Sequence, residues 1–183
     1  VTGGLSVATT TDTSYSVTGL TANTAYQFKV KAENLGNPGS YSDYTDNSSA
    51  TYTYATQVSD FTVTNATNTT TLQLTLAWTN NSQTGMKVER DNACNGSYDA
   101  TVYDNASAND ITPTTTSSGL SANTCYRYRI SSYNGGGVLN SVSPTVSSDV
   151  TTPPGQPQSV IAVTSDETEI TWGWNEVTNA TSY

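Results

Sequence analysis

Apolar and polar residues alternate strictly along several short stretches of this chain. Two of them are Tyr26–Lys31 (YQFKVK) and Tyr126–Ser131 (YRYRIS). Such alternation is typical of a β-strand with one buried face and one solvated face. No window of ten or more residues has the spacing of an amphipathic helix. The pattern therefore predicts an all-β fold.

One of these stretches follows a segment that occurs twice. Gly19–Tyr26 (GLTANTAY) is repeated as Gly119–Tyr126 (GLSANTCY), 100 positions later. A period of about one small domain indicates consecutive modules, each with its own modest core. We therefore expect an array of β-modules, whose function is that of an array.

The middle of the chain, 56–152, holds the complete set of predicted strands. Its core side chains are expected on the inward faces, among them Leu74, Leu76 and Trp78 on one strand and Met86 and Val88 on the next. The glycines at 135–137 predict a turn, because glycine tolerates positive φ. A polar segment, 91–118, connects the third strand to the next one. The five predicted strands are Val58–Val63, Leu72–Trp78, Met86–Arg90, Tyr126–Ser132 and Val142–Val150.

Partial modules are predicted on either side of this unit. Residues 1–55 repeat its later strands without a tryptophan strand, so they are expected to be the C-terminal part of a module. Residues 153–183 follow a stiff, proline-rich linker and are expected to be the N-terminal strands of a further module. There, Ile170–Trp174 repeats the tryptophan strand, with Trp174 96 positions after Trp78.

Taken together, these motifs resemble tandem fibronectin type III modules, and the resemblance covers almost the whole chain. It implies β-sandwiches in an extracellular, microbial protein. It also implies that the leucine-to-tyrosine element is a tyrosine corner, in which the hydroxyl bonds to nearby backbone. The matching features are the proline-rich linker, 180–183 entering a third strand, and the expected core residues Trp78, Trp174, Leu20, Tyr26, Leu120 and Tyr126.

The resemblance also places the two cysteines. In a fibronectin type III module the third strand and the strand of Tyr126 are antiparallel neighbours. Cys94 follows the end of one and Cys125 begins the other, so we expect a disulfide between them. The first module has Ala25 in place of Cys125, so the bridge is a local staple. Immunoglobulin modules fit less well, because the cysteines are not in the inter-sheet positions.

The amino-acid composition limits the expected location of the protein and the classes of partner. Nearly a third of the residues are Thr or Ser, only 11% are charged, and the net charge is −9. The six cations form no basic run, which argues against a nucleic-acid partner. No stretch of 18 apolar residues exists, so no membrane insertion is expected. We expect an extracellular or cell-surface location. Glycosylation sequons, which permit modification without demonstrating it, occur at Asn47, Asn65, Asn68, Asn80, Asn95, Asn105 and Asn179.

Candidate chemistry is sparse. The chain has no histidine, which excludes Ser-His-Asp and Cys-His catalysis. Acidic residues are scattered over loops, so we predict no catalytic residues, no enzyme activity and no cofactor. The oxygen-rich run Asp91–Asp99 departs from the calcium-loop spacing, and we predict no metal site. Tyr52 and Tyr54 share one strand face; they form a platform for a glycan, or they cover the seam between modules or fill the core.

These observations predict a non-catalytic structural array that serves as a spacer, a stalk or the repeating body of a filament. Its partners would be neighbouring modules or copies of itself. Two alternatives are an accessory region of a secreted polysaccharide-degrading enzyme and an adhesion module that binds a glycan or a surface protein. Because the two end segments are complementary, the chain is interpreted as a cut from a longer array, a subunit that exchanges strands head to tail, or a permuted protein.

Overall fold

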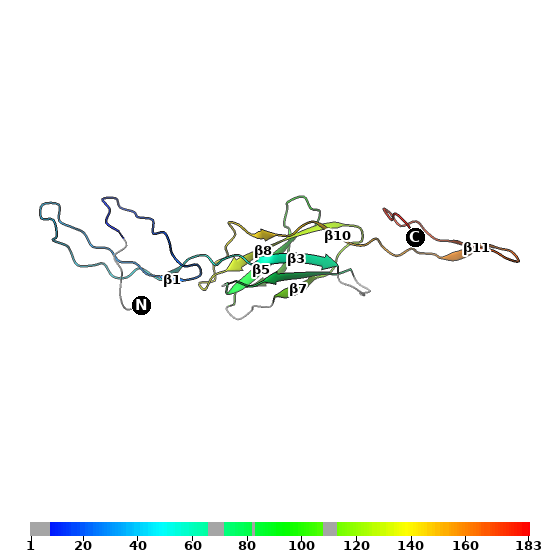
Figure 1. Ribbon diagram of the computed structural model, residues 1–183, viewed down its shortest axis with the longest axis horizontal. Coiled ribbons are helices and arrows are strands. Elements are labelled where there is room, and N and C mark those ends of the chain that lie inside the picture. The colour runs from blue at the N-terminus through cyan, green and yellow to red at the C-terminus, as the bar shows by residue number, and fades with distance from the viewer. Residues whose placement is uncertain (1–7, 66–71, 82, 108–112) are drawn as a thin grey trace.

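The structure is a computed structural model that describes residues 8–65, 72–81, 83–107 and 113–183. It is elongated, with a sandwich in the middle and a smaller segment at either side (Figure 1). The described residues form twelve β-strands and no helix. The predicted all-β sandwich class is confirmed. No helix in these ranges has the length and apolar character needed to cross a bilayer.

One sheet of the middle unit has three strands. It contains β3 (Ser59–Asn65), β4 (Leu74–Thr79) and β7 (Thr114–Ser117), in the order β3-β4-β7. Both pairs are antiparallel, and Leu76 of β4 lies opposite Val63 of β3 and Thr115 of β7.

The other sheet covers this one. It contains β6 (Ala100–Asn105), β5 (Gly85–Asp91), β8 (Cys125–Tyr133) and β10 (Val150–Thr151), in the order β10-β8-β5-β6. A further strand, β9 (Thr145–Val146), also pairs with β8. β5 and β8 are antiparallel neighbours, as the resemblance implied.

The core lies between these two sheets and consists of the alternating residues that the pattern singled out. Leu74, Leu76 and Trp78 of β4 are buried against Met86 and Val88 of β5. The other members of the core are Val58, Tyr126, Tyr128 and Ile130, with Leu120, Phe61 and Val150 packed against them. Alternation thus sends one side of each strand inward and leaves the other side to solvent.

Two strands, β6 and β7, lie in the segment that was predicted as a polar connection. β7 reads TTTS, which has no alternation, and it joins the sheet by pairing with β4. Thr favours strands through its branched side chain, but that preference does not reveal a strand in a Thr-rich chain. The predicted strand Val142–Val150 is also wrong in extent, because the structure has two short strands, β9 and β10, in its place.

The break between β9 and β10 is made by a hydroxyl. Ser147 donates its N–H to the Tyr128 carbonyl oxygen at 2.9 Å, and its Oγ accepts the Tyr128 N–H at 3.0 Å. A side-chain oxygen thus replaces a backbone carbonyl in the ladder.

The first segment uses the same device repeatedly. Its strands are only β1 (Ala25–Tyr26) and β2 (Thr51–Tyr52), so the strand expected over Tyr26–Lys31 is wrong in length. Further along, the backbone N–H groups of Phe28, Val30 and Ala32 are bonded by hydroxyl oxygens at about 3 Å, from Ser48, Thr45 and Ser42. These bonds satisfy the backbone without a regular strand.

The last segment is a hairpin of β11 (Ile161–Ser165) and β12 (Ile170–Gly173). The core position expected for Trp174 is wrong in this structure, since 44% of its surface is exposed, and Trp172 beside it is 56% exposed. Within the described part of 153–183, no second sheet covers these rings. The strand entry expected at 180–183 is absent from these described residues as well.

Both copies of the leucine-to-tyrosine element fold alike. The hydroxyl oxygen of Tyr26 accepts the Thr21 N–H at 3.0 Å, and that of Tyr126 accepts the Ser121 N–H at 2.9 Å. Tyr126 is buried, whereas Leu20, Tyr26 and Leu120 are half-buried. The expected module boundaries at 55/56 and 152/153 stay predictions.

Candidate functional site: the joints between units

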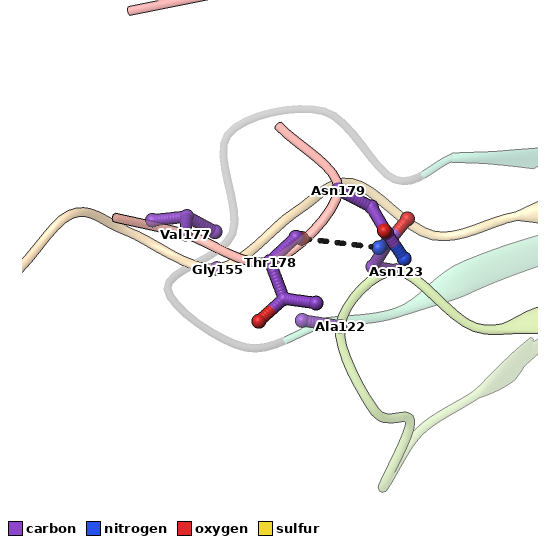
Figure 2. Close-up of a pocket in the computed structure, with 6 residues that line it drawn as sticks. All are labelled: Ala122, Asn123, Gly155, Val177, Thr178 and Asn179. Carbon is purple, nitrogen blue, oxygen red and sulfur yellow. Dashed lines mark hydrogen bonds between the residues drawn. The ribbon is translucent and has the colours of Figure 1, made fainter. Parts of the chain in front are cut away.

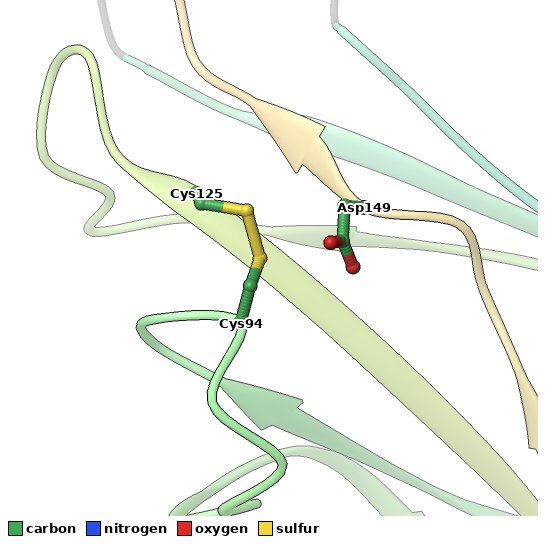
Figure 3. Close-up of side chains that lie close together, drawn as sticks. All are labelled: Cys94, Cys125 and Asp149. Carbon is green, nitrogen blue, oxygen red and sulfur yellow. A yellow bond between two sulfur atoms is a disulfide. The ribbon is translucent and has the colours of Figure 1, made fainter.

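The predicted cysteine pair is bonded in the structure. Cys94, just after β5, and Cys125, the first residue of β8, form a disulfide with their Cα atoms 5.8 Å apart. Figure 3 shows Asp149 beside this bridge. Because β5 ends where β8 begins, the bridge joins neighbouring strands of one sheet.

Cys94, Cys125 and Asp149 are the one group in the described ranges with the residue types and spacing of a metal site. Both sulfur atoms are in the disulfide, so neither is a thiolate ligand. The Asp149 carboxylate is held by the Arg127 guanidinium, with Nη2 and Oδ2 3.0 Å apart. This contact lowers the pKa of Asp149. The group is therefore structural.

The oxygen-rich run Asp91–Asp99 is organised by its own backbone. The side chain of Asp91 is buried, and it accepts the N–H groups of Ala93 at 3.0 Å and Gly96 at 2.7 Å. Burial acts to raise the pKa of Asp91, but these backbone donors outweigh it and lower the pKa. The carboxylate thus shapes the loop that carries Cys94.

Lys87 and Arg129 form ion pairs with Glu89 on the outer face of β5 and β8. Glu89 accepts from Arg129 Nε at 2.7 Å and lies 3.1 Å from Lys87 Nζ. Burial raises the pKa of Glu89, but the hydrogen bonds from Arg129 and Lys87 lower it overall. The Arg129 guanidinium also lies 4.4 Å from the centroid of the Tyr98 ring. The Glu89–Arg129 contact is a cross-strand pair and the Glu89–Lys87 contact lies within β5, and each is worth less than about 1 kcal/mol.

The joint between the first segment and the middle unit contains Tyr52 and Tyr54. The ring of Tyr52 lies against the backbone of Gly135 and Gly136, in the loop after β8. The Tyr54 carbonyl oxygen accepts the Asn23 N–H at 3.0 Å, and its ring is half exposed. The structure therefore places Tyr52 in the seam between units, one of the three positions predicted for it.

Several amides cross this first joint. Asn23 Oδ1 accepts the Gly135 N–H at 2.6 Å, and Asn134 Nδ2 donates to the Thr53 carbonyl oxygen at 3.0 Å. Asn140 Nδ2 donates to the Ala55 carbonyl oxygen at 3.0 Å. Within the middle unit, Gln57 Oε1 accepts the Ser132 N–H at 2.9 Å. Polar groups, among them the buried Asn134, are thus paired across the joint, which fixes how the two units meet.

The second joint reuses the same loop position. Asn123, the repeat of Asn23, donates from Nδ2 to the Thr178 carbonyl oxygen at 3.2 Å, as Figure 2 shows. Both asparagines have a left-handed backbone, with φ of 52°. Beside this bond lies an open pocket of about 380 Å³, lined by Ala122, Asn123, Gly155, Val177, Thr178 and Asn179.

Sequence reasoning missed the role of these asparagines. The signal was present, because Asn is the same in both copies of the GLxANTxY element and tolerates the left-handed conformation that its backbone adopts. Nothing in the pattern, however, indicated that its side chain would reach the next unit.

The predicted sequons differ in exposure. Asn80 and Asn105 are half-buried, and Asn80 Oδ1 accepts from the indole nitrogen of Trp78 at 3.0 Å. Asn68 lies outside the described residues. The exposed sequon residues are Asn47, Asn65, Asn95 and Asn179. Glycosylation at any of them stays a prediction.

Comparison with known proteins gives two similarities. No protein-family model matches the chain. Exoglucanase B of Cellulomonas fimi is 31% identical over 193 residues, a match of 97% of this chain and 16% of the exoglucanase. A crystal structure of the FN1–FN3 domains of chicken CNTN1 superposes with a TM-score of 0.41 and 21% identity, covering 74% of this chain and 45% of that one. The chain thus spans about one sixth of the length of its curated relative.

Removal of the disulfide tests its role as a staple. We expect the double variant Cys94→Ser/Cys125→Ser to lose about 3–4 kcal/mol of unfolding free energy, because the bridge closes a loop in the unfolded chain. Urea denaturation, followed by tryptophan fluorescence, measures the change. Reductant should destabilise the native chain and leave the double variant unaffected; equal stability of the two proteins would contradict the prediction.

Asp91 predicts a dependence of stability on pH. Its folded-state pKa lies below its unfolded value, so its contribution is complete above about pH 4 and disappears as the pH falls. Asp91→Asn should cost about 1–3 kcal/mol at pH 7, because a donor replaces an acceptor opposite an N–H group.

The two proteins should converge in stability as the pH falls from 5 toward 2. Urea denaturation at a series of pH values gives the difference directly. A difference that stays constant over this range would show that the ionised carboxylate is not what stabilises the loop. Asp99→Asn, a change at an exposed acid of the same run, is the matched control.

Proposed function

We propose that the chain is an array of fibronectin type III-like sandwiches with a non-catalytic structural role, which holds other parts of an extracellular protein apart. One observation carries the proposal: at each joint the Asn of the same repeated loop bonds to the next unit. An array that sets distance needs ordered contacts of this kind between its units. The network at the first joint supports a spacer with a defined direction.

The chemistry of the side chains supports a non-catalytic role. The chain has no histidine. In the described part of the middle unit, Glu89 and Asp149 are bound by cations, and Asp91 is bound by backbone N–H groups. A general acid needs a proton that it can give to a substrate near neutral pH. The lowered pKa values of these three groups keep them ionised and unable to donate one.

The extracellular setting belongs to the same proposal. A disulfide that bridges two strands persists in an oxidising compartment. A surface dominated by Thr and Ser keeps such an array wettable with few charges, and the hydroxyls also complete the backbone ladder.

A second candidate function is an accessory, non-catalytic part of a polysaccharide-degrading enzyme. The similarity to Exoglucanase B favours it. In that case the spacer separates domains that lie outside these residues. The third candidate, adhesion through a glycan platform of Tyr52 and Tyr54, receives less support, because Tyr52 is occupied by the loop of the next unit.

The spacer role predicts that the chain neither degrades nor binds polysaccharide. We expect no release of reducing sugar from cellulose, chitin or xylan, and no depletion of the chain from solution by the insoluble polymers. Tyr54→Ala should behave like the native chain in both assays. Retention that is lost in Tyr54→Ala and kept in Tyr15→Ala, which removes another exposed tyrosine, would support adhesion instead.

Copies of the chain are the partners that we propose for the exposed hairpin of β11 and β12. Its apolar residues, including Val163, Trp172 and Ile161, are open to solvent, and exposed strand edges pair readily. If a second copy covers them, the full chain should sediment as larger assemblies at high concentration, and deletion of 153–183 should abolish this. Unchanged sedimentation after the deletion would exclude strand exchange at this segment.

A further inference from the structure

The first joint contains a contact in which size decides the fit. A Cβ atom at Gly135 would lie 2.5 Å from Cε1 of Tyr52, and one at Gly136 would lie 3.0 Å from its Cδ2. The aromatic ring therefore rests directly on the loop backbone. A side chain at Gly135 would have to displace the ring.

Backbone conformation does not explain these two glycines. Gly137, the third of the run, has a φ of 74°, which favours glycine. Gly135 and Gly136 are not among the described residues with positive φ. The close approach of Tyr52 is thus the feature of the structure that disfavours a larger residue at Gly135.

Hydrogen bonds hold the loop against the ring from both sides. The Gly135 N–H is bonded to Asn23 Oδ1 of the first segment. Next to it, Asn134 is only 1% exposed, and its amide spans the joint to Thr53. The ring and the loop are therefore fixed relative to each other. A larger side chain at either position is not accommodated by a shift of the loop along the ring.

The first segment has its own copy of this loop. Asn34 Oδ1 accepts the Gly36 N–H at 2.9 Å, as Asn134 Oδ1 accepts the Gly136 N–H at 3.1 Å. Leu35 thus occupies the place of Gly135, and it is 99% exposed.

The strand side of the joint also has two versions. Tyr52 lies opposite Ala25 in the ladder, and Thr151 lies opposite Cys125, the repeat of Ala25. Thr151 is therefore the counterpart of Tyr52 in the middle unit. One unit offers a large ring at this position and the other a small side chain.

We propose that these two positions select which unit can dock on which. The end that carries Tyr52 fits a unit whose loop has glycine at the Gly135 position, and it rejects a loop that carries leucine there, such as that of Leu35. An end with a small residue, as at Thr151, accepts the larger loop residue. The surface around Tyr52 is thus an interface specific for a glycine loop.

The inference depends on the proposed array in one respect only: in an array, this contact would determine the order of the units. The contact itself holds whether the chain is a spacer or an accessory region of an enzyme. Its failure is also separable from that of the proposed function, because polysaccharide binding and hydrolysis do not report on the joint.

The test is a size exchange in the full chain, read by residual dipolar couplings in solution. In the native chain the first segment and the middle unit should fit one common alignment tensor. Gly135→Leu should separate the two tensors, because the leucine displaces Tyr52. Gly135→Ala, whose Cβ alone reaches the ring, should act in the same direction. Adding Tyr52→Thr to Gly135→Leu should restore the common tensor, since the corresponding strand of the middle unit carries a threonine, Thr151, at the equivalent position.

Val138→Leu is the matched control, since Val138 is an exposed position of the same loop and should leave the common tensor unchanged. Couplings within the middle unit report whether each variant is folded. Two results would overturn the proposal: a common tensor retained in Gly135→Leu, or a double variant whose tensors are as different as those of Gly135→Leu alone.

Discussion

One threonine hydroxyl ties each unit together at the end from which the next unit begins. Thr152 Oγ1 donates to the Ser121 carbonyl oxygen at 2.6 Å and accepts the Thr124 N–H at 3.0 Å. Thr53 does the same for Thr21 and Thr24, at 2.7 and 3.1 Å. With the tyrosine hydroxyl on the other side of the loop, these bonds satisfy backbone groups that no strand reaches.

The orientation of the joints depends on this arrangement. Because the loop is held at both sides, Asn23 and Asn123 keep their left-handed backbone and present their amides to the following unit. Thr152 stands immediately before the proline-rich linker, and its hydroxyl ties the end of the last strand to the loop. Hydrogen bonds within one unit thereby fix the orientation of the next unit relative to it.

Buried apolar side chains are concentrated in the middle unit, and the segments at either side have few. In the middle unit two sheets enclose Leu74, Met86 and Tyr128, and apolar area removed from water is the main stabilising contribution. In the segments at either side, Trp172 and Phe28 remain exposed. In the first segment, hydroxyl oxygens accept hydrogen bonds from the backbone N–H groups and hold the backbone instead. The first segment therefore gains order from its joint with the middle unit, where Ala55 is buried.

Alternation was enough to predict the all-β class and the strands of the core, because the buried residues of one strand face, such as Leu74 and Leu76 or Met86 and Val88, recur at every second position. β7 could not be predicted, since its four polar residues carry no such period and its order comes from β4. Trp174 was assigned to a core by analogy with Trp78, but burial depends on the opposite sheet. The joints were also missed, because Asn23 and Gly135 are 112 positions apart in the sequence and meet only in the folded structure.

Amide hydrogen exchange at the first joint tests the central claim, that the units meet through ordered polar contacts. The Gly135 N–H is bonded across the joint to Asn23 Oδ1. The account predicts that this N–H exchanges far more slowly than a free amide, and that Asn23→Ala releases it while Tyr128 in the core stays protected. Rapid exchange of Gly135 in the native chain would contradict an ordered joint and leave the units as independent bodies on a linker.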